Sequence, residues 1–162
     1  MKIGIAIEAV AAAERELADE LIAVGERHKP DHDVYQLTRT LAKMERGHVD
    51  ALASHAARYE TELTDGGDGA PAPGPLRAAV EKGAELLGRR PEAGLLLLRD
   101  LRRLHLCAAG ASLDWVALAQ AAQAAKDPEL LATVTACHSE TLRTLKWSTY
   151  RLKEAAPQVL TS

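Results

Sequence analysis

Two side chains able to bind a metal lie three residues apart in the segment MERGHVDALASH (44–55), where Glu45 and His48 form a Glu-x-x-His pair. Residues three apart share one face of a helix, so the carboxylate and the imidazole point in the same direction. Carboxylate oxygen and imidazole nitrogen are ligands for zinc, manganese and iron. The pair therefore predicts either half of a metal site or two polar residues on a solvated helix face.

A further carboxylate, Glu14, interrupts the apolar face of the first predicted helix, residues 2–27. The other members of this face are spaced by threes and fours and are Ile3, Ile7, Val10, Leu17, Leu21 and Val24. A turn is predicted at HKPDHD (28–33), where Pro30 ends the helix and Asp31 or Asp33 caps the next one. Glu14 and the Glu45–His48 pair lie at similar distances on either side of this turn. An antiparallel hairpin would place them at the same height, where buried carboxylates need a metal, a cation or a hydrogen-bonding partner.

The rest of the chain is also predicted to be helical, because Ala and Leu supply most of the apolar residues, aromatics are 3% and Phe is absent. The second helix spans about 33–64, with one face made of Val34, Leu37, Leu41, Met44, His48, Leu52, His55 and Tyr59. The Gly- and Pro-rich residues 65–75 predict a flexible linker, and 76–88 a short helix. The last two long helices span about 91–125 and 128–155, separated by KDP (126–128), and the second ends before Pro157.

The inward faces of these last two helices follow from their apolar spacing. The third long helix presents Leu97, Leu101, Leu104, Ala108, Ala111, Trp115 and Leu118. The last helix presents Leu131, Val134, His138, Leu142, Leu145 and Leu152. In this phase His138 faces the core, which makes it a candidate fourth ligand, and Glu140 is turned away by about 200°.

The pattern predicts a single all-α domain over residues 1–162, with hairpins over about 2–64 and 91–156 and a connection over 65–90. A Glu on the first helix with Glu-x-x-His on the second resembles the ferritin-like superfamily. The segment from Leu95 to Lys153 resembles the second hairpin of small bacterial stress-associated ferritin-like proteins. The resemblance implies a ferritin-like four-helix bundle with one long crossover and a carboxylate-bridged metal centre.

The second hairpin departs from the family's pattern. No glutamate occurs between Glu92 and Glu129, and Cys137-His138-Ser139-Glu140 replaces the second Glu-x-x-His. Because a complete di-iron set is missing, we expect a degenerate site and a non-catalytic binding or assembly role. The alternative is a metal-binding enzyme or storage protein that holds one iron, manganese or zinc ion. Its ligands would be Glu14, Glu45 and His48, with His138 from across the bundle, whereas a metal-free polar cluster would pair His48 with Glu14.

Composition narrows the other function classes. A net charge of −3 without a dense Lys/Arg block argues against a nucleic-acid surface, and the apolar run 94–98 is too short to cross a membrane. Glu8 interrupts the apolar opening segment, which favours a helix of a cytoplasmic protein over a signal peptide. Cys107 and Cys137 are expected to be free thiols. The Ala-rich segments 108–112 and 117–125 allow close helix approach within the bundle or in a homodimer.

The remaining polar residues are expected to lie outside the site. His28 and His32 flank a turn and are predicted to be solvated, and Arg99-Asp100 with Arg102-Arg103 is predicted to form a solvated face or a dimer contact. His55 and His105 are expected at the edge of the core. Trp115 and Trp147 are expected to act as core or interface anchors.

Overall fold

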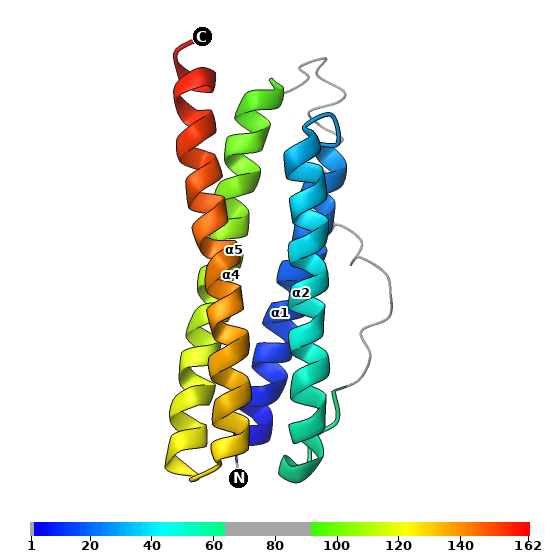
Figure 1. Cartoon of the computed structure of the whole chain (residues 1–162), viewed down its shortest axis with the longest axis vertical. Coiled ribbons are helices and arrows are strands. Elements are labelled where there is room, and N and C mark those ends of the chain that lie inside the picture. Colours follow the sequence, from blue (N-terminus) through cyan, green and yellow to red (C-terminus); the bar gives the residue numbers. More distant parts are fainter. Residues whose placement is uncertain (1, 64–91) are drawn as a thin grey trace.

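The computed structural model describes residues 2–63 and 92–162, and this part of the chain forms an all-α four-helix bundle (Figure 1). The helices are α1 (Ile3–Arg27), α2 (His32–Ala56), α4 (Ala93–Ala124) and α5 (Pro128–Leu160), and a 3-10 turn, η1 (Ala57–Tyr59), follows α2. No strand occurs in these residues. The predicted linker 65–75 and short helix 76–88 lie outside the described residues. No helix of the described part is long and apolar enough to cross a bilayer.

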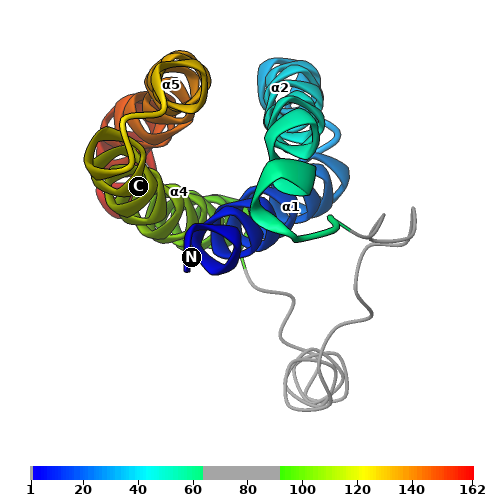
Figure 2. The ribbon, with the colours of Figure 1, turned by 90° about the horizontal axis from the view of Figure 1, so that it is seen from below.

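The four helices alternate in direction within each hairpin. α1 and α5 run upward in Figure 1, whereas α2 and α4 run downward, so α2 ends at the opposite end of the bundle from the start of α4. α1 packs against both α2 and α4, and α4 packs against α5. The α2–α5 interface is the sparsest of the four, and Figure 2 shows these two helices standing apart on one side. The backbones of the two hairpins therefore approach least closely between α2 and α5.

Both hairpin turns are closed by aspartate caps. Asp31 accepts a hydrogen bond from the Val34 amide at 3.2 Å, and Arg151 of α5 donates to the same carboxylate at 2.6 Å. Asp127 accepts from the Leu130 amide at 3.0 Å, with Pro128 in the first turn of α5. Each cap satisfies an amide that the first turn of a helix leaves without a partner.

Two helix ends differ from the predicted bounds, and tertiary contacts explain both. α2 ends at Ala56 rather than near residue 64, because the chain turns to pack on the start of α1. A Cβ on Gly4 would lie 2.8 Å from the Tyr59 carbonyl oxygen, so glycine permits this approach. α5 continues through Pro157 to Leu160, because Val159 packs against Gly94 at the start of α4. This packing offsets the backbone hydrogen bond that proline removes.

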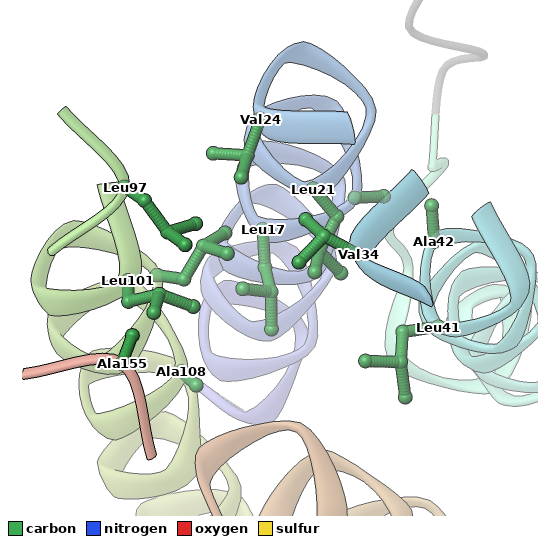
Figure 3. Close-up of a cluster of buried hydrophobic side chains, with 12 residues drawn as sticks. Leu17, Leu21, Val24, Val34, Leu41, Ala42, Leu97, Leu101, Ala108 and Ala155 are labelled. Atoms are coloured by element: carbon green, nitrogen blue, oxygen red, sulfur yellow. The ribbon is translucent and has the colours of Figure 1, made fainter. Parts of the chain in front are cut away.

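The core consists of two apolar clusters placed one above the other along the bundle. Figure 3 shows one of them, in which Leu17, Leu21 and Val24 of α1 contact α2 and α4. The other gathers Ile3, Ile7 and Val10 with residues of the remaining helices, including Trp115. All the predicted inward positions of α1 and α4 are buried, so these two predictions are confirmed. Glu14 lies in the stretch of α1 between the two clusters.

The predicted inward face of α5 is only partly correct, because Leu131, Leu145 and Leu152 pack against the core but stay partly exposed. The buried positions of this helix are Leu130, Val134, Cys137, Thr141, Thr144, Ser148 and Ala155. Only Val134 belongs to the predicted set, and the true face is rotated by one residue, which corresponds to about 100°. On α2 a similar exchange buries Thr38 and leaves Leu37 half-exposed. Hydroxyl side chains thus lie in the core, and leucines that follow or precede them in the sequence are only partly buried.

Candidate metal centre

Glu14, Glu45 and His48 meet between α1 and α2 and form what we call the carboxylate–imidazole cluster. Their exposed fractions are 0%, 0% and 3%. His48 Nδ1 lies 3.1 Å from Glu14 Oε2 and 3.1 Å from Glu45 Oε2. One ligand-capable atom from each residue lies within 4.8 Å of the other two. The prediction that the three residues lie at the same height is confirmed.

The second hairpin faces this cluster with neutral hydrogen-bond donors. Trp115 Nε1 donates to Glu14 Oε1 at 2.5 Å, and the Thr141 hydroxyl donates to the same oxygen at 2.8 Å. The Thr144 hydroxyl donates to Glu45 Oε1 at 2.5 Å. Thr141 and Thr144 repeat on α5 the three-residue spacing of Glu45 and His48 on α2. Together with the two His48 contacts, these donors give every carboxylate oxygen of the cluster a partner.

Glu140 reaches the cluster from the side of the bundle that faces solvent. Its Oε2 lies 2.8 Å from His48 Nε2, and its side chain is 43% exposed. The prediction that Glu140 points away from the core was wrong, because the buried face of α5 is centred on its neighbour Thr141. His48 therefore contacts Glu14 and Glu45 through one ring nitrogen and Glu140 through the other.

Burial and hydrogen bonding have opposite effects on the pKa values of the cluster, and their balance sets its protonation. Burial acts to raise the pKa of Glu14, but hydrogen bonds from His48, Trp115 and Thr141 outweigh it and hold that pKa below its usual value. Burial and the adjacent Glu14 carboxylate raise the pKa of Glu45 to about 7. Burial alone would lower the pKa of His48, but its three carboxylate partners raise it to about 10. Without a metal, the cluster holds an imidazolium beside the Glu14 carboxylate.

The structure does not bring the other histidines into the cluster. His138, the predicted fourth ligand, lies 2.7 Å from the Ser112 hydroxyl. His105 is held by Thr149 at 3.0 Å, and His55 lies 2.9 Å from Thr133. Within the described residues, the group able to hold a metal contains only Glu14, Glu45 and His48.

A second polar cluster lies at the α1–α4 interface and corrects two predictions. Asp100 was expected on a solvated face or in a dimer contact and His28 in solvent, yet they are only 1% and 7% exposed. Asp100 Oδ2 accepts a hydrogen bond from Arg27 Nε at 2.9 Å and lies 2.9 Å from His28 Nε2. Burial would raise the pKa of Asp100, but these two partners lower it to about 2. The cluster ties the end of α1 to the first turns of α4.

The sequence analysis did not identify Thr141 and Thr144 of the first cluster or the burial of Asp100 in the second. The spacing of these residues nevertheless contained a usable signal. Thr141 and Thr144 have the same three-residue spacing as a Glu-x-x-His pair, and they lie on α5, which faces the Glu-x-x-His pair of α2. Asp100 lies three residues after Leu97 and four before Leu104, which places it beside the buried face.

Comparison of the chain with protein-family models, with curated proteins and with solved structures finds no match. Functional conclusions therefore depend on the chemistry of the residues. The oxygen and nitrogen atoms of the carboxylate–imidazole cluster suit a divalent transition-metal ion, because two carboxylates balance its charge and imidazole supplies a nitrogen ligand. The same atoms also suit a closed hydrogen-bonded network.

Proposed function

We propose that the chain is a ferritin-like bundle that binds one divalent transition-metal ion through Glu14, Glu45 and His48 in a non-catalytic role. The observation that carries this proposal is the convergence of three buried ligand atoms within 4.8 Å. The ferritin-like assignment is supported by Glu-x-x-His on α2 facing a glutamate on α1. The parallel directions of α2 and α4 also fit a bundle with one crossover.

A single ion is proposed because the second hairpin lacks the ligands for another. A dinuclear centre of this superfamily uses a glutamate and a Glu-x-x-His pair from each hairpin. Here α4 supplies Trp115, whose indole nitrogen only donates hydrogen bonds, and α5 supplies the neutral hydroxyls of Thr141 and Thr144. The Glu140 carboxylate of α5 contacts the opposite nitrogen of His48 and does not belong to the ligand group. Storage or oxygen activation by a pair of bridged ions therefore has no support in the donor set.

The set of two carboxylates and one imidazole narrows the choice of metal. Manganese, iron(II) and zinc accept mixed oxygen and nitrogen ligands, whereas copper(I) prefers sulfur. Binding also requires His48 Nδ1 and both carboxylates to be deprotonated, so an incoming cation displaces protons from the cluster. The affinity is expected to rise with pH for this reason.

Metal titration of the purified full chain tests the proposal. The protein is stripped with a chelator and titrated with Mn²⁺, Zn²⁺ or, without oxygen, Fe²⁺, and the bound metal is counted by elemental analysis. We expect one ion per chain. At a metal concentration 100 times the Kd, the gain in unfolding free energy is about 2.7 kcal/mol. For a chain of this size such a gain raises the Tm by roughly 5–11 °C.

Two variants place the ion. His48→Gln is expected to abolish stoichiometric binding, and the matched control His138→Gln is expected to keep it, because His138 lies against Ser112 rather than in the cluster. The proposal is abandoned if no metal binds stoichiometrically or if His48→Gln binds as tightly as the wild type.

A metal-free structural cluster is the second candidate. The observation in its favour is that every carboxylate oxygen of Glu14 and Glu45 already accepts a hydrogen bond, with the His48 imidazolium as the internal cation. The bundle would then act in binding or assembly through its surface. This candidate predicts that none of the three metals binds stoichiometrically or raises the Tm.

A further inference from the structure

Resting on the proposed single-metal function, we infer that Glu140 is the positioning residue that makes Nδ1 of His48 the metal-binding nitrogen. Neutral imidazole carries its proton on one nitrogen and a lone pair on the other, and only the lone pair binds a metal. The position of the proton on the ring therefore decides which nitrogen of His48 is able to bind a metal.

The hydrogen bond from His48 to Glu140 assigns the proton. An ionised carboxylate only accepts hydrogen bonds, so at 2.8 Å from Glu140 Oε2 the Nε2 atom must be the donor. In the neutral ring the lone pair is then on Nδ1. This nitrogen is the one that lies 3.1 Å from both Glu14 and Glu45. The lone pair is thereby released toward the two carboxylate ligands rather than toward solvent.

Glu140 acts through His48 rather than as a ligand. The atoms that could hold the ion belong to Glu14, Glu45 and His48, and Glu140 does not belong to this group. Its carboxylate contacts the opposite nitrogen of the ring and is 43% exposed, whereas the three ligands are buried. It approaches from α5, across the sparse interface with α2. A carboxylate behind a metal-binding imidazole fixes the ring and increases the basicity of the ligand nitrogen.

Trp115 restricts the same ring from another side. Its ring stands edge-on to the His48 ring, with centroids 6.1 Å apart and planes at 83°. A rotated imidazole would lose the bond to Glu140 and both contacts to the buried carboxylates. Trp115 therefore limits where the ring lies, whereas Glu140 determines where its proton lies.

An ordinary half-exposed ion pair is the competing explanation, and it predicts a different result. Such pairs contribute little to stability and have no influence on a ligand beyond their charge. Stability alone does not separate the two explanations, so the test must read the His48 ring and the metal affinity directly. Glu129 supplies a matched control, because it is an exposed glutamate of α5 paired with Arg58 at 3.2 Å.

The affinity experiment compares Glu140→Ala, Glu140→Gln and Glu129→Ala with the wild type, using Zn²⁺ and calorimetry on the stripped full chain. Loss of the carboxylate behind a ligand histidine lowers metal affinity by roughly 10- to 100-fold, which is the expected effect of Glu140→Ala. The zinc affinity of Glu140→Gln should lie between those of the wild type and Glu140→Ala, because its amide oxygen still accepts a hydrogen bond from Nε2. Glu129→Ala should bind zinc within twofold of the wild type.

The second measurement is the ¹⁵N–¹H spectrum of the His48 side chain, assigned by its absence in His48→Gln. In the wild type, with and without zinc, we expect a downfield Nε2–H resonance that exchanges slowly with water. In Glu140→Ala this proton should shift upfield and exchange faster, and in Glu129→Ala it should not change. This measurement reads the hydrogen bond without relying on metal binding.

The outcomes separate this inference from the proposed function. A wild-type chain that takes up no zinc overturns the single-metal proposal, and the role of Glu140 falls with it. A wild-type chain that binds zinc while Glu140→Ala binds equally tightly overturns the role of Glu140 alone. Zinc-bound protein that keeps the proton on Nδ1, or an equal loss of affinity in Glu129→Ala, has the same consequence.

Discussion

Acid unfolding of an Asp100→Asn variant tests the buried cluster at the α1–α4 interface. Asp100 is 1% exposed and accepts hydrogen bonds from Arg27 and His28 of the other hairpin. Asparagine keeps the shape of the side chain but removes its charge. At neutral pH the variant should therefore be less stable than the wild type, because Arg27 loses its buried counter-ion and His28 loses its contact with a carboxylate oxygen.

The magnitude follows from the pKa of Asp100. The folded protein lowers that pKa from 3.8 to about 2, and each unit is equivalent to about 1.36 kcal/mol, so the ionised carboxylate contributes about 2 kcal/mol. A carboxyl group whose pKa is lowered by folding stabilises the folded state at pH values above its pKa in the unfolded chain, which is near 4. This contribution is lost as the pH falls from about 4 toward 2. The expected difference in Tm at neutral pH is roughly 4–8 °C.

Urea unfolding of both proteins at a series of pH values from 7 to 2 measures this contribution. The gap in unfolding free energy between wild type and Asp100→Asn should stay constant down to about pH 4 and then narrow by about 2 kcal/mol. The control Asp50→Asn removes an exposed carboxylate and reports the general effect of losing one negative charge. A gap that does not narrow below pH 4, or one that narrows equally for Asp50→Asn, would refute the reasoning.

Two further pairs of variants test packing and hydrogen bonding. Gly4→Ala should lower the unfolding free energy by about 1–3 kcal/mol in thermal denaturation, because its Cβ would lie 2.8 Å from the Tyr59 carbonyl oxygen. Gly110→Ala, which meets nothing within 4 Å, should instead raise it by about 0.5–1 kcal/mol, and equal effects of the two would contradict the proposed close approach. Thr144→Val should lower the unfolding free energy by about 1–3 kcal/mol, because it removes a donor from buried Glu45. The exposed Thr135→Val should have little effect on the urea midpoint, and an equal loss there would count against a special role for Thr144.

Local periodicity was sufficient to predict the half of the site that belongs to the first hairpin. The apolar spacing of α1 identified Glu14 as a core position, and the turn near residue 30 related its height to that of Glu45 and His48. Both signals come from one hairpin with a short turn. The length of that turn largely fixes which residues of its two helices lie at the same height. The structure confirms the convergence of these three residues.

The second hairpin's contribution was not predictable in the same way, because it depends on contacts between hairpins. The apolar spacing did not place Thr141 and Thr144 on the inward face, and their burial rotates that face of α5. That rotation brings Glu140 to His48 and takes His138 to Ser112. An apolar pattern does not reveal a helix whose core face is partly polar.

The sequence by itself determined the helical class, the two hairpins and the position of the first three polar residues, because helix periodicity and turn residues act over short stretches of chain. Only the tertiary structure decided which polar side chains are partnered. His28 and Asp100 are 72 positions apart, and His48 and Glu140 are 92 apart. Such a residue is buried only where the opposing helix places a hydrogen-bonding or charged side chain against it. Those contacts form between the two hairpins, so the spacing of residues within one helix does not predict them.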